Sequence, residues 1–287
     1  MDVSIIIVNY NTAELIHNCL QSIYLQTKDI SFEVIVSDNN SADGSVELIK
    51  TKFPEVILIE NETNLGFGAA NNRGVKIAKG KFIFFLNSDT ILLNNAVKYF
   101  YDFWNEKSKN VNIGALGSWL LSNDSDVVHS WGEYPTFYSC KHYLNRLAIS
   151  VFLRKFLFFK KKKCCSTQTD VNGFLEIGGY VTGADLFVLN NDDAYFDEDY
   201  FMYFEETDLQ LNHFTKKGKK IFIIPGPKII HLEGGSDKKA NIKNYNFKAK
   251  SSMFYWESCI KYLRKNNLAS NKEIEKLQIR IEKKLRS

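Results

Sequence analysis

Carboxylates follow apolar stretches at two places in the sequence, where they could bind a metal ion or move a proton. At the first, the large apolar residues 82–86 stop at Asn87, Ser88 and Asp89. Such a run predicts a strand buried on both faces, and open α/β sheets bind ligands beyond the carboxyl ends of such strands. The alternative is that residues 87–89 form a turn and cap a helix beginning near Asn94.

At the second place, Glu205, Glu206 and Asp208 follow the aromatic run 200–204 and open an amphipathic helix that runs to Lys216. Acidic residues in a first helical turn are favoured by the helix dipole, which gives these carboxylates a structural explanation. Aromatic neighbours would also desolvate a carboxylate and raise its pKa. A carboxylate with a raised pKa is a candidate general base.

The elements before Asp89 alternate between strand and helix patterns. Segments 3–8, 32–36 and 56–60 are rich in β-branched residues, and amphipathic stretches separate them. This alternation predicts an α/β fold with a mostly parallel sheet and right-handed crossovers. Residues 1–90 are therefore expected to form an α/β half of the type that binds nucleotides.

Loops after these strands carry further polar candidates. Asp38 follows the second strand, where it could accept hydrogen bonds from a base or ribose, or cap a helix near Asp43. Gly66 and Gly68 do not make a dinucleotide fingerprint, which belongs in the first strand-to-helix turn with a third glycine. A nicotinamide cofactor is therefore not expected.

The second half, residues 91–240, combines helices with further strands. Strand patterns cover 113–121, 184–189, 221–224 and 228–231, and 127–134 has hairpin character. The last strand ends at His231, and a lone histidine is more often structural than a ligand. Residues 241–287 are helical and basic, with an apolar stripe suited to packing.

Residues 144–163 are both apolar on one helical face and strongly basic. This combination suits an amphipathic helix lying on an anionic membrane surface. The alternative is a helical hairpin packed on the domain with its lysines in solvent.

Composition restricts the class of protein further. The net charge of +4 over 287 residues does not indicate nucleic-acid binding. Five cysteines without metal-ligand spacing fit a reducing cytosol, and no signal peptide or membrane-spanning run is expected. The sequence predicts a cytoplasmic protein with possible peripheral contact at the inner membrane.

Seven motifs in order resemble the inverting family 2 glycosyltransferases of the GT-A fold, within their rhamnosyltransferase-like branch. The resemblance covers residues 1–240, the expected transferase domain. It is carried by VSIIIVNYNT (3–12), VIVSDNNSADGS (34–45), NLGFGAANNRG (64–74), FLNSDT (85–90), TGADLFVL (182–189), FDEDYFMYFEETDLQLN (196–212) and IIHLEGGS (229–236).

The resemblance implies a nucleotide-sugar site. It places Asn9 and Tyr10 near the base, Asp38 on the uracil or thymine edge, and Asn71 and Asn72 along the cleft. Asn87, Ser88 and Asp89 match the metal motif, in which Asp89 would bind Mg²⁺ or Mn²⁺ and His231 would complete the site. Asn87 departs from the family's usual first aspartate.

The resemblance also implies a catalytic base and a function. Glu206 matches the base, with Glu205 and Asp208 as alternatives, and Asp185 lies near the donor sugar and acceptor. The expected reaction moves a sugar, with L-rhamnose from TDP-rhamnose preferred and a UDP-hexose as the alternative. The acceptor is a glycan, expected to be lipid-linked, in bacterial surface polysaccharide synthesis.

Two other classes of function are weighed against this transferase. A non-catalytic member would bind nucleotide-sugar or scaffold polysaccharide assembly without turnover. A sugar-phosphate nucleotidyltransferase would need a Gly-rich, Arg-containing loop after the first strand, and residues 9–12 (NYNT) are neither.

Overall fold

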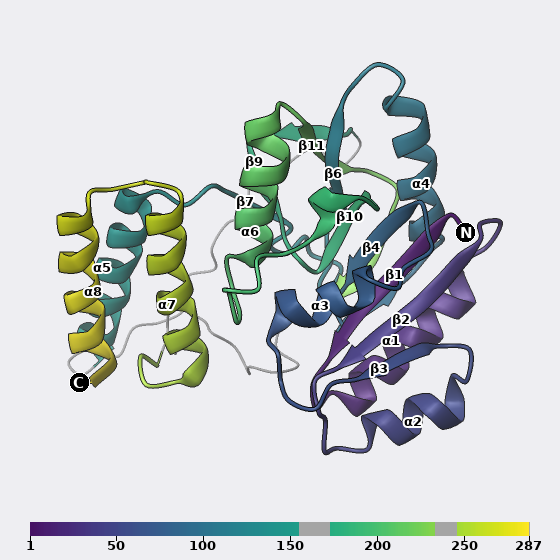
Figure 1. The fold of residues 1–287 in the computed structure, drawn as a ribbon, viewed down its shortest axis with the longest axis horizontal. Helices are drawn as coiled ribbons and strands as arrows, with labels where there is room; N and C mark the ends of the chain where they lie inside the picture. The colour runs from purple at the N-terminus through teal and green to yellow at the C-terminus, as the bar shows by residue number, and fades with distance from the viewer. Residues whose placement is uncertain (155–172, 233–245, 287) are drawn as a thin grey trace. The chain divides into compact units, whose positions relative to one another are not determined.

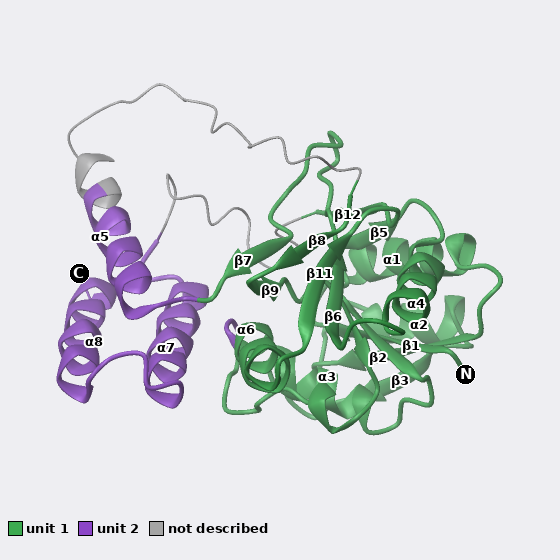
Figure 2. Ribbon diagram, turned by 90° about the horizontal axis from the view of Figure 1, so that it is seen from above, with its two compact units in different colours: residues 1–134, 169–201, 205–236 green, residues 135–168, 202–204, 237–287 purple. Residues whose placement is uncertain are grey.

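The computed structural model describes residues 1–154, 173–232 and 246–286 (Figure 1). The chain divides into two compact units (Figure 2). Unit 1 comprises residues 1–134, 169–201 and 205–236, and unit 2 comprises residues 135–168, 202–204 and 237–287. Residues 155–163, the second part of the predicted membrane segment, lie outside the described residues.

An eight-stranded sheet organises unit 1, in the order β3-β2-β1-β4-β10-β6-β11-β8. Its strands are β1 (Val3–Asn9), β2 (Phe32–Asp38), β3 (Ile57–Glu60), β4 (Phe82–Leu86), β6 (Ile113–Ser118), β8 (Leu175–Ile177), β10 (Asp185–Leu189) and β11 (Lys220–Ile224). Strands β3, β2, β1 and β4 are mutually parallel, whereas β10 lies antiparallel between β4 and β6. The predicted mostly parallel central sheet is confirmed.

Strand β4 is buried on both faces, as its unbroken apolar run predicts. Phe82, Phe84 and Leu86 join one core, and Ile83 and Phe85 join the other, because successive side chains point to opposite faces. The first core is covered by α1 (Ala13–Gln26), α2 (Ser45–Lys52) and α4 (Ala96–Lys107). The second is covered by α3 (Phe67–Val75) and α6 (Glu205–Leu209).

Two small sheets stand beside the central one. Strand β5 (Thr90–Leu92) pairs antiparallel with β12 (Ile229–His231), so that His231 lies opposite Thr90. Strand β7 (Trp131–Glu133) pairs antiparallel with β9 (Gly179–Val181), and the hairpin character expected at 127–134 reduces to this short strand and an isolated bridge. The sheet of β5 and β12 therefore brings His231 close to the carboxyl end of β4.

Unit 2 contains α5 (Phe137–Arg154), α7 (Lys250–Lys265) and α8 (Asn271–Arg286), shown in Figure 2. Arg280 on α8 donates a hydrogen bond to Asn145 on α5 at 2.6 Å, and the Tyr143 and Trp256 ring centroids lie 6.0 Å apart. Leu144 and Leu147 are buried. Leu144 and Leu147 of the predicted membrane segment thus pack within unit 2, whereas Ile149 is 57% exposed.

This grouping differs from the boundary expected at residue 240. The structure joins residues 135–168 to the C-terminal helices rather than to the transferase domain. The reason is that α5 packs on helices more than a hundred residues later, a pairing that a reading along the chain does not show. No helix in the described part of the chain combines the length and apolarity needed to cross a bilayer.

Candidate active site

The carboxyl ends of β2, β1 and β4 form a polar cluster, because parallel neighbours end at the same edge of the sheet. Asn9 and Asp38 are the last residues of paired strands and lie opposite each other. Asn9 Nδ2 donates to Asp38 Oδ1 at 2.7 Å, and both residues are buried. The structure thus brings these two predicted residues together.

Asp38 does not cap a helix. Its Oδ2 accepts the backbone N–H of Ser41 at 2.8 Å, and its Oδ1 accepts the Ser41 hydroxyl at 2.7 Å. Helix α2 begins after Gly44, and Asp43 instead accepts the N–H groups of Ala13 and Ser45. The capping alternative for Asp38 is therefore wrong, and Asp38 holds the loop that follows β2.

Tyr10 lies at the surface of this cluster, with 44% of the residue exposed. The next residue, Asn11, has a left-handed backbone (φ 53°), and its N–H donates to Ser41 at 2.9 Å. Ser41 thus ties the loop after β1 to the loop after β2. An exposed aromatic ring over a fixed polar cluster is suited to stacking on a base.

Thr12 connects this cluster to the end of β4. Its hydroxyl lies 2.6 Å from Asn9 Oδ1 and 3.2 Å from Ser88 Oγ. Thr12 and Ser41 were not singled out from the sequence, although both stand inside the motifs that carry the family resemblance. Their positions in the loops after β1 and β2 could have identified them as site residues from the sequence.

Residues 87–90 form a turn, as the alternative interpretation of this segment predicts, but they do not cap a helix. Asn87 O accepts the hydroxyl of Thr90 at 2.8 Å, and Asn87 N donates to Ala184 O at 3.1 Å. Helix α4 begins after Asn95 without a side-chain cap. The structure thus places Asp89 in this turn and not at the start of α4.

Asp89 and His231 meet at this turn. Asp89 Oδ1 lies 3.3 Å from His231 Nε2, and the two side chains are 14% and 16% exposed. The backbone holds the pair together, since Leu232 N donates to Asp89 O at 3.0 Å. A carboxylate oxygen is a ligand that Mg²⁺ and Mn²⁺ prefer, so Asp89 is the member of the pair that suits these ions. The described residues contain no cluster of three metal-ligating side chains.

Asp185 is fully buried at the start of β10, opposite Leu86. Its Oδ2 accepts the Ser118 N–H at 2.7 Å and the Ser118 hydroxyl at 2.6 Å. Among the described residues, none donates to its Oδ1. Burial raises the pKa of the Asp185 carboxyl to about 7, and the Ser118 hydrogen bonds and the charge of His231 partly oppose this rise.

Helix α6 places its three acidic residues in different surroundings. Glu205 is 3% exposed and Asp208 is 1% exposed, whereas Glu206 is half-buried. Asp208 Oδ1 accepts the Tyr200 hydroxyl at 3.3 Å and the Asn212 amide at 3.0 Å, so it holds the helix and the preceding loop. Glu206 is the best placed of the three to reach a substrate.

The side chain of Glu206 begins next to Gly183. A Cβ atom on Gly183 would lie 3.8 Å from Glu206 Cβ and 3.2 Å from the Phe67 ring. Burial raises the pKa of Glu206 to about 6, and the backbone N–H groups of Glu206 and Thr207 oppose the rise. A carboxylate of this pKa is ionised at neutral pH and remains basic enough to accept a proton.

Two residues of the aromatic run before α6 pack on a helix of unit 2. Tyr203 and Phe204 both have left-handed backbones, with φ of 70° and 68°. Their rings pack on Tyr255, with centroids 5.8 and 5.3 Å away, and these residues belong to unit 2. These two rings therefore take part in the packing of unit 2.

Asn71 and Asn72 are buried in α3 and make protein contacts. Asn71 Nδ2 donates to Phe67 O at 3.1 Å. Asn72 Nδ2 donates to Phe196 O and to Glu198 at 2.9 and 3.0 Å, and its Oδ1 accepts Phe196 N at 2.9 Å. Asn72 thus anchors the loop after β10, and its place along the nucleotide-sugar cleft stays a prediction.

A model of the family described as "Glycosyl transferase family 2" matches residues 4–164, more than half of the chain. The chain belongs to glycosyl transferase family 2. The match includes the strand ends that carry Asn9, Asp38 and Asp89. Its extent does not specify a rhamnosyltransferase branch.

Curated relatives resemble the chain over its first part. It is 36% identical over 121 residues to a poly(ribitol-phosphate) beta-glucosyltransferase of Bacillus spizizenii, covering 40% of this chain and 19% of the relative. It is 40% identical over 88 residues to a UDP-Glc:alpha-D-GlcNAc-diphosphoundecaprenol beta-1,3-glucosyltransferase of Escherichia coli, covering 30% and 35%. The chain spans less than half the length of either relative.

Solved structures confirm the GT-A type fold. The 1–349 fragment of TarS from S. aureus matches 81% of this chain and 60% of its own, with a TM-score of 0.52 and 17% identity. A mannosyltransferase from Pyrobaculum calidifontis, solved with GDP-Man and Mn²⁺, covers 94% and 65%, with a TM-score of 0.53 and 16% identity. At these identities the likeness concerns the fold.

Proposed function

We propose that this family 2 member is an active inverting glycosyltransferase that moves a sugar from a nucleotide-sugar donor to a glycan acceptor. The observation that carries the proposal is the gathering of Asn9, Asp38 and Asp89 at the ends of adjacent strands, with His231 brought to Asp89 from β12. The named relatives act on glycan or polyol-phosphate acceptors, which supports a role in bacterial surface polysaccharide synthesis.

In this proposal the nucleotide lies over the ends of β1 and β2. Tyr10 stacks on the base, and Asp38 presents its carboxylate to the base edge from a loop that Ser41 and Asn9 hold in place. Asn87, Ser88, Asp89 and His231 surround the diphosphate. A Mg²⁺ or Mn²⁺ ion held by Asp89 and His231 would neutralise the diphosphate charge when bound.

Glu206 is the proposed base. It takes the proton of the acceptor hydroxyl as that oxygen forms a bond to the anomeric carbon, on the face opposite the diphosphate. The bond from the anomeric carbon to the diphosphate oxygen breaks, and the nucleoside diphosphate leaves with the electron pair, so the anomeric configuration inverts. Asp185, buried beside Leu86, positions the end of β4 near the donor sugar.

The donor preference is L-rhamnose from TDP-rhamnose, with UDP-hexoses as the alternative. The glucosyl and N-acetylglucosaminyl activities in the relatives' names support testing UDP-hexoses with equal weight. The proposed acceptor is lipid-linked, and the proposed location is the cytoplasm, at the inner face of the membrane.

The test is release of nucleoside diphosphate from a panel of TDP- and UDP-sugars, with Mg²⁺, Mn²⁺ or a chelator. We expect one donor to be cleaved slowly without acceptor, and Asp89→Ala to abolish the signal. Asp124→Ala, in an exposed loop, is the matched control and should leave it unchanged. Tight binding of a donor without cleavage, also after lipid-linked acceptors are supplied, would favour the non-catalytic alternative.

A further inference from the structure

Charge is strongly segregated between the two units. Unit 2 carries 22 lysines and arginines against 5 aspartates and glutamates, whereas unit 1 carries 15 against 28. The net charges are therefore +17 and −13, which the chain total of +4 conceals. A module of this charge is attracted to an anionic surface.

Helix α8 has one face buried and the opposite face basic. Ile274, Leu277 and Ile281 are buried within unit 2. The opposite stripe, at helical spacing of four and three residues, is exposed throughout and consists of Lys272, Lys276, Ile279, Lys283 and Arg286. This set is called the α8 stripe below.

The centre of the α8 stripe is apolar. Ile279 is 65% exposed and has lysines one turn away on both sides. Single exposed apolar residues are common on soluble proteins, but here the isoleucine stands within a row of basic residues. An interfacial helix inserts such a side chain among lipid chains while its lysines contact the head groups. A soluble polyanion would use the lysines and leave Ile279 without a function.

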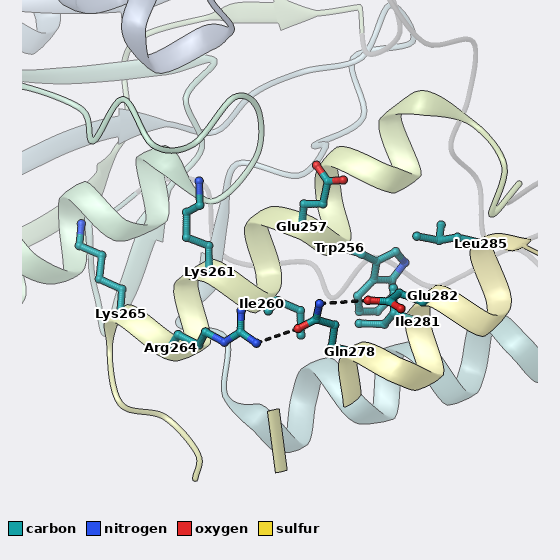
Figure 3. A pocket seen from close by; sticks show the side chains of 10 residues that line it. All are labelled: Trp256, Glu257, Ile260, Lys261, Arg264, Lys265, Gln278, Ile281, Glu282 and Leu285. Atoms are coloured by element: carbon teal, nitrogen blue, oxygen red, sulfur yellow. Dashed lines mark hydrogen bonds between the residues drawn. The ribbon is translucent and has the colours of Figure 1, made fainter. Parts of the chain in front are cut away.

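Unit 2 also has a groove, which none of the α8 stripe residues lines (Figure 3). It has a volume of about 510 Å³ and lies between α7 and α8, with Trp256, Ile260, Ile281 and Leu285 among its apolar lining. Lys261, Arg264 and Lys265 of α7 contribute its basic side chains. Arg264 donates to Gln278 at 2.7 Å, and Gln278 donates to Glu282 at 3.0 Å, which joins the two helices along the groove.

We propose that the α8 stripe docks the protein on a bilayer of anionic phospholipids, with Ile279 inserted and the lysines on phosphate head groups. The occupant is the bilayer surface, chosen because both the charge and the exposed apolar residue complement it. The proposal does not rest on sugar transfer, and its test needs no donor or acceptor.

The test is flotation of the full chain with vesicles of phosphatidylcholine, with and without phosphatidylglycerol. We expect binding to the anionic vesicles, weakened by about a hundredfold in K272Q/K276Q/K283Q, because each basic residue near an anionic surface contributes about a fivefold effect. Ile279→Ser should weaken it by about tenfold. Circular dichroism should show that both variants are folded, since the replaced side chains are exposed.

Matched controls remove the same charge and apolarity from unit 1. K52Q/K76Q/K109Q and Leu25→Ser replace exposed residues there and should leave binding unchanged. The proposal is overturned by equal binding to both vesicles, by no binding, or by an equal loss in the control triple. Unchanged binding of Ile279→Ser also overturns the proposal, in favour of a soluble polyanion as the ligand. If binding is lost only when Lys160 to Lys163 are replaced with Gln, the proposal is overturned because the membrane surface lies outside α8.

Discussion

At the scale of single residues, Glu206 differs from its acidic neighbours in exposure and in its hydrogen-bond partners. Asp208 serves Tyr200 and Asn212, and Glu205 is buried, whereas Glu206 is half-buried. We expect Glu206→Gln to lower the rate of transfer by about a hundredfold to ten-thousandfold, the usual contribution of a general base. Glu205→Gln is the matched control, and a larger loss there would reassign the base.

The raised pKa of Glu206 predicts a pH dependence. The base must be ionised, so kcat/KM for transfer should fall about tenfold per pH unit below the pKa of about 6 and level off above it. The measurement is a pH profile of transfer at limiting acceptor. A midpoint near the ordinary pKa of a glutamate would contradict the burial that the structure assigns to Glu206.

Asp185 should make stability depend on pH in the opposite sense to an ordinary aspartate. Its pKa is about 7 in the folded chain, above the unfolded value of 3.8, so folding takes up a proton between these limits. The free energy of unfolding therefore falls as pH rises through this window. Asp185→Asn removes the effect, and its advantage over the parent should grow to on the order of 4 kcal/mol by pH 7.

Urea unfolding at a series of pH values, in metal-free buffer, checks this expectation. Ser118→Ala is the companion variant, because it removes the hydroxyl donor to Asp185 Oδ2 while the backbone N–H donor of residue 118 stays, and it should steepen the loss. An advantage of Asp185→Asn that is the same at acid and neutral pH would show that the carboxyl is not the cause.

At the scale of elements, α3 and the loop after β10 are joined by Asn72. We expect Asn72→Ala to lower the free energy of unfolding by about 2 to 3 kcal/mol, because Phe196 N and O are left without their partner. Nucleotide affinity of the folded variant should change little. A loss of affinity without a loss of stability would instead support the predicted place of Asn72 in the donor cleft. Asn105→Ala, on α4, serves as the surface control.

At the scale of the whole molecule, the division into units predicts how the chain can be cut. A chain ending at residue 240 keeps α5 but removes α7 and α8, which exposes Leu144 and Leu147. We expect it to bind a hydrophobic dye and to aggregate on gel filtration. Replacing residues 135–168 with a short linker in the same truncated chain should restore a monomer. Equal behaviour of the two truncated chains would contradict the grouping.

The sequence by itself determined the local features of this protein. The strands before Asp89 and the polar residues at their ends follow from hydrophobic patterns a few residues long. Parallel neighbours end at one edge, so the meeting of Asn9 and Asp38 could be expected before any coordinates. The family motifs carried the same positions in the same order, and the family model confirms the membership.

Only the tertiary structure decided what depends on contacts between distant segments. It showed that the pairing of β12 with β5 is what brings His231, which the family resemblance had already assigned to the Asp89 site, next to Asp89. It also buried Asp185 against Ser118, with one oxygen lacking a described donor. It showed that Asn72 forms hydrogen bonds with the loop after β10 and that α5 groups with the C-terminal helices. No pattern within one segment records its distant partner, because packing and burial are properties of both surfaces that meet.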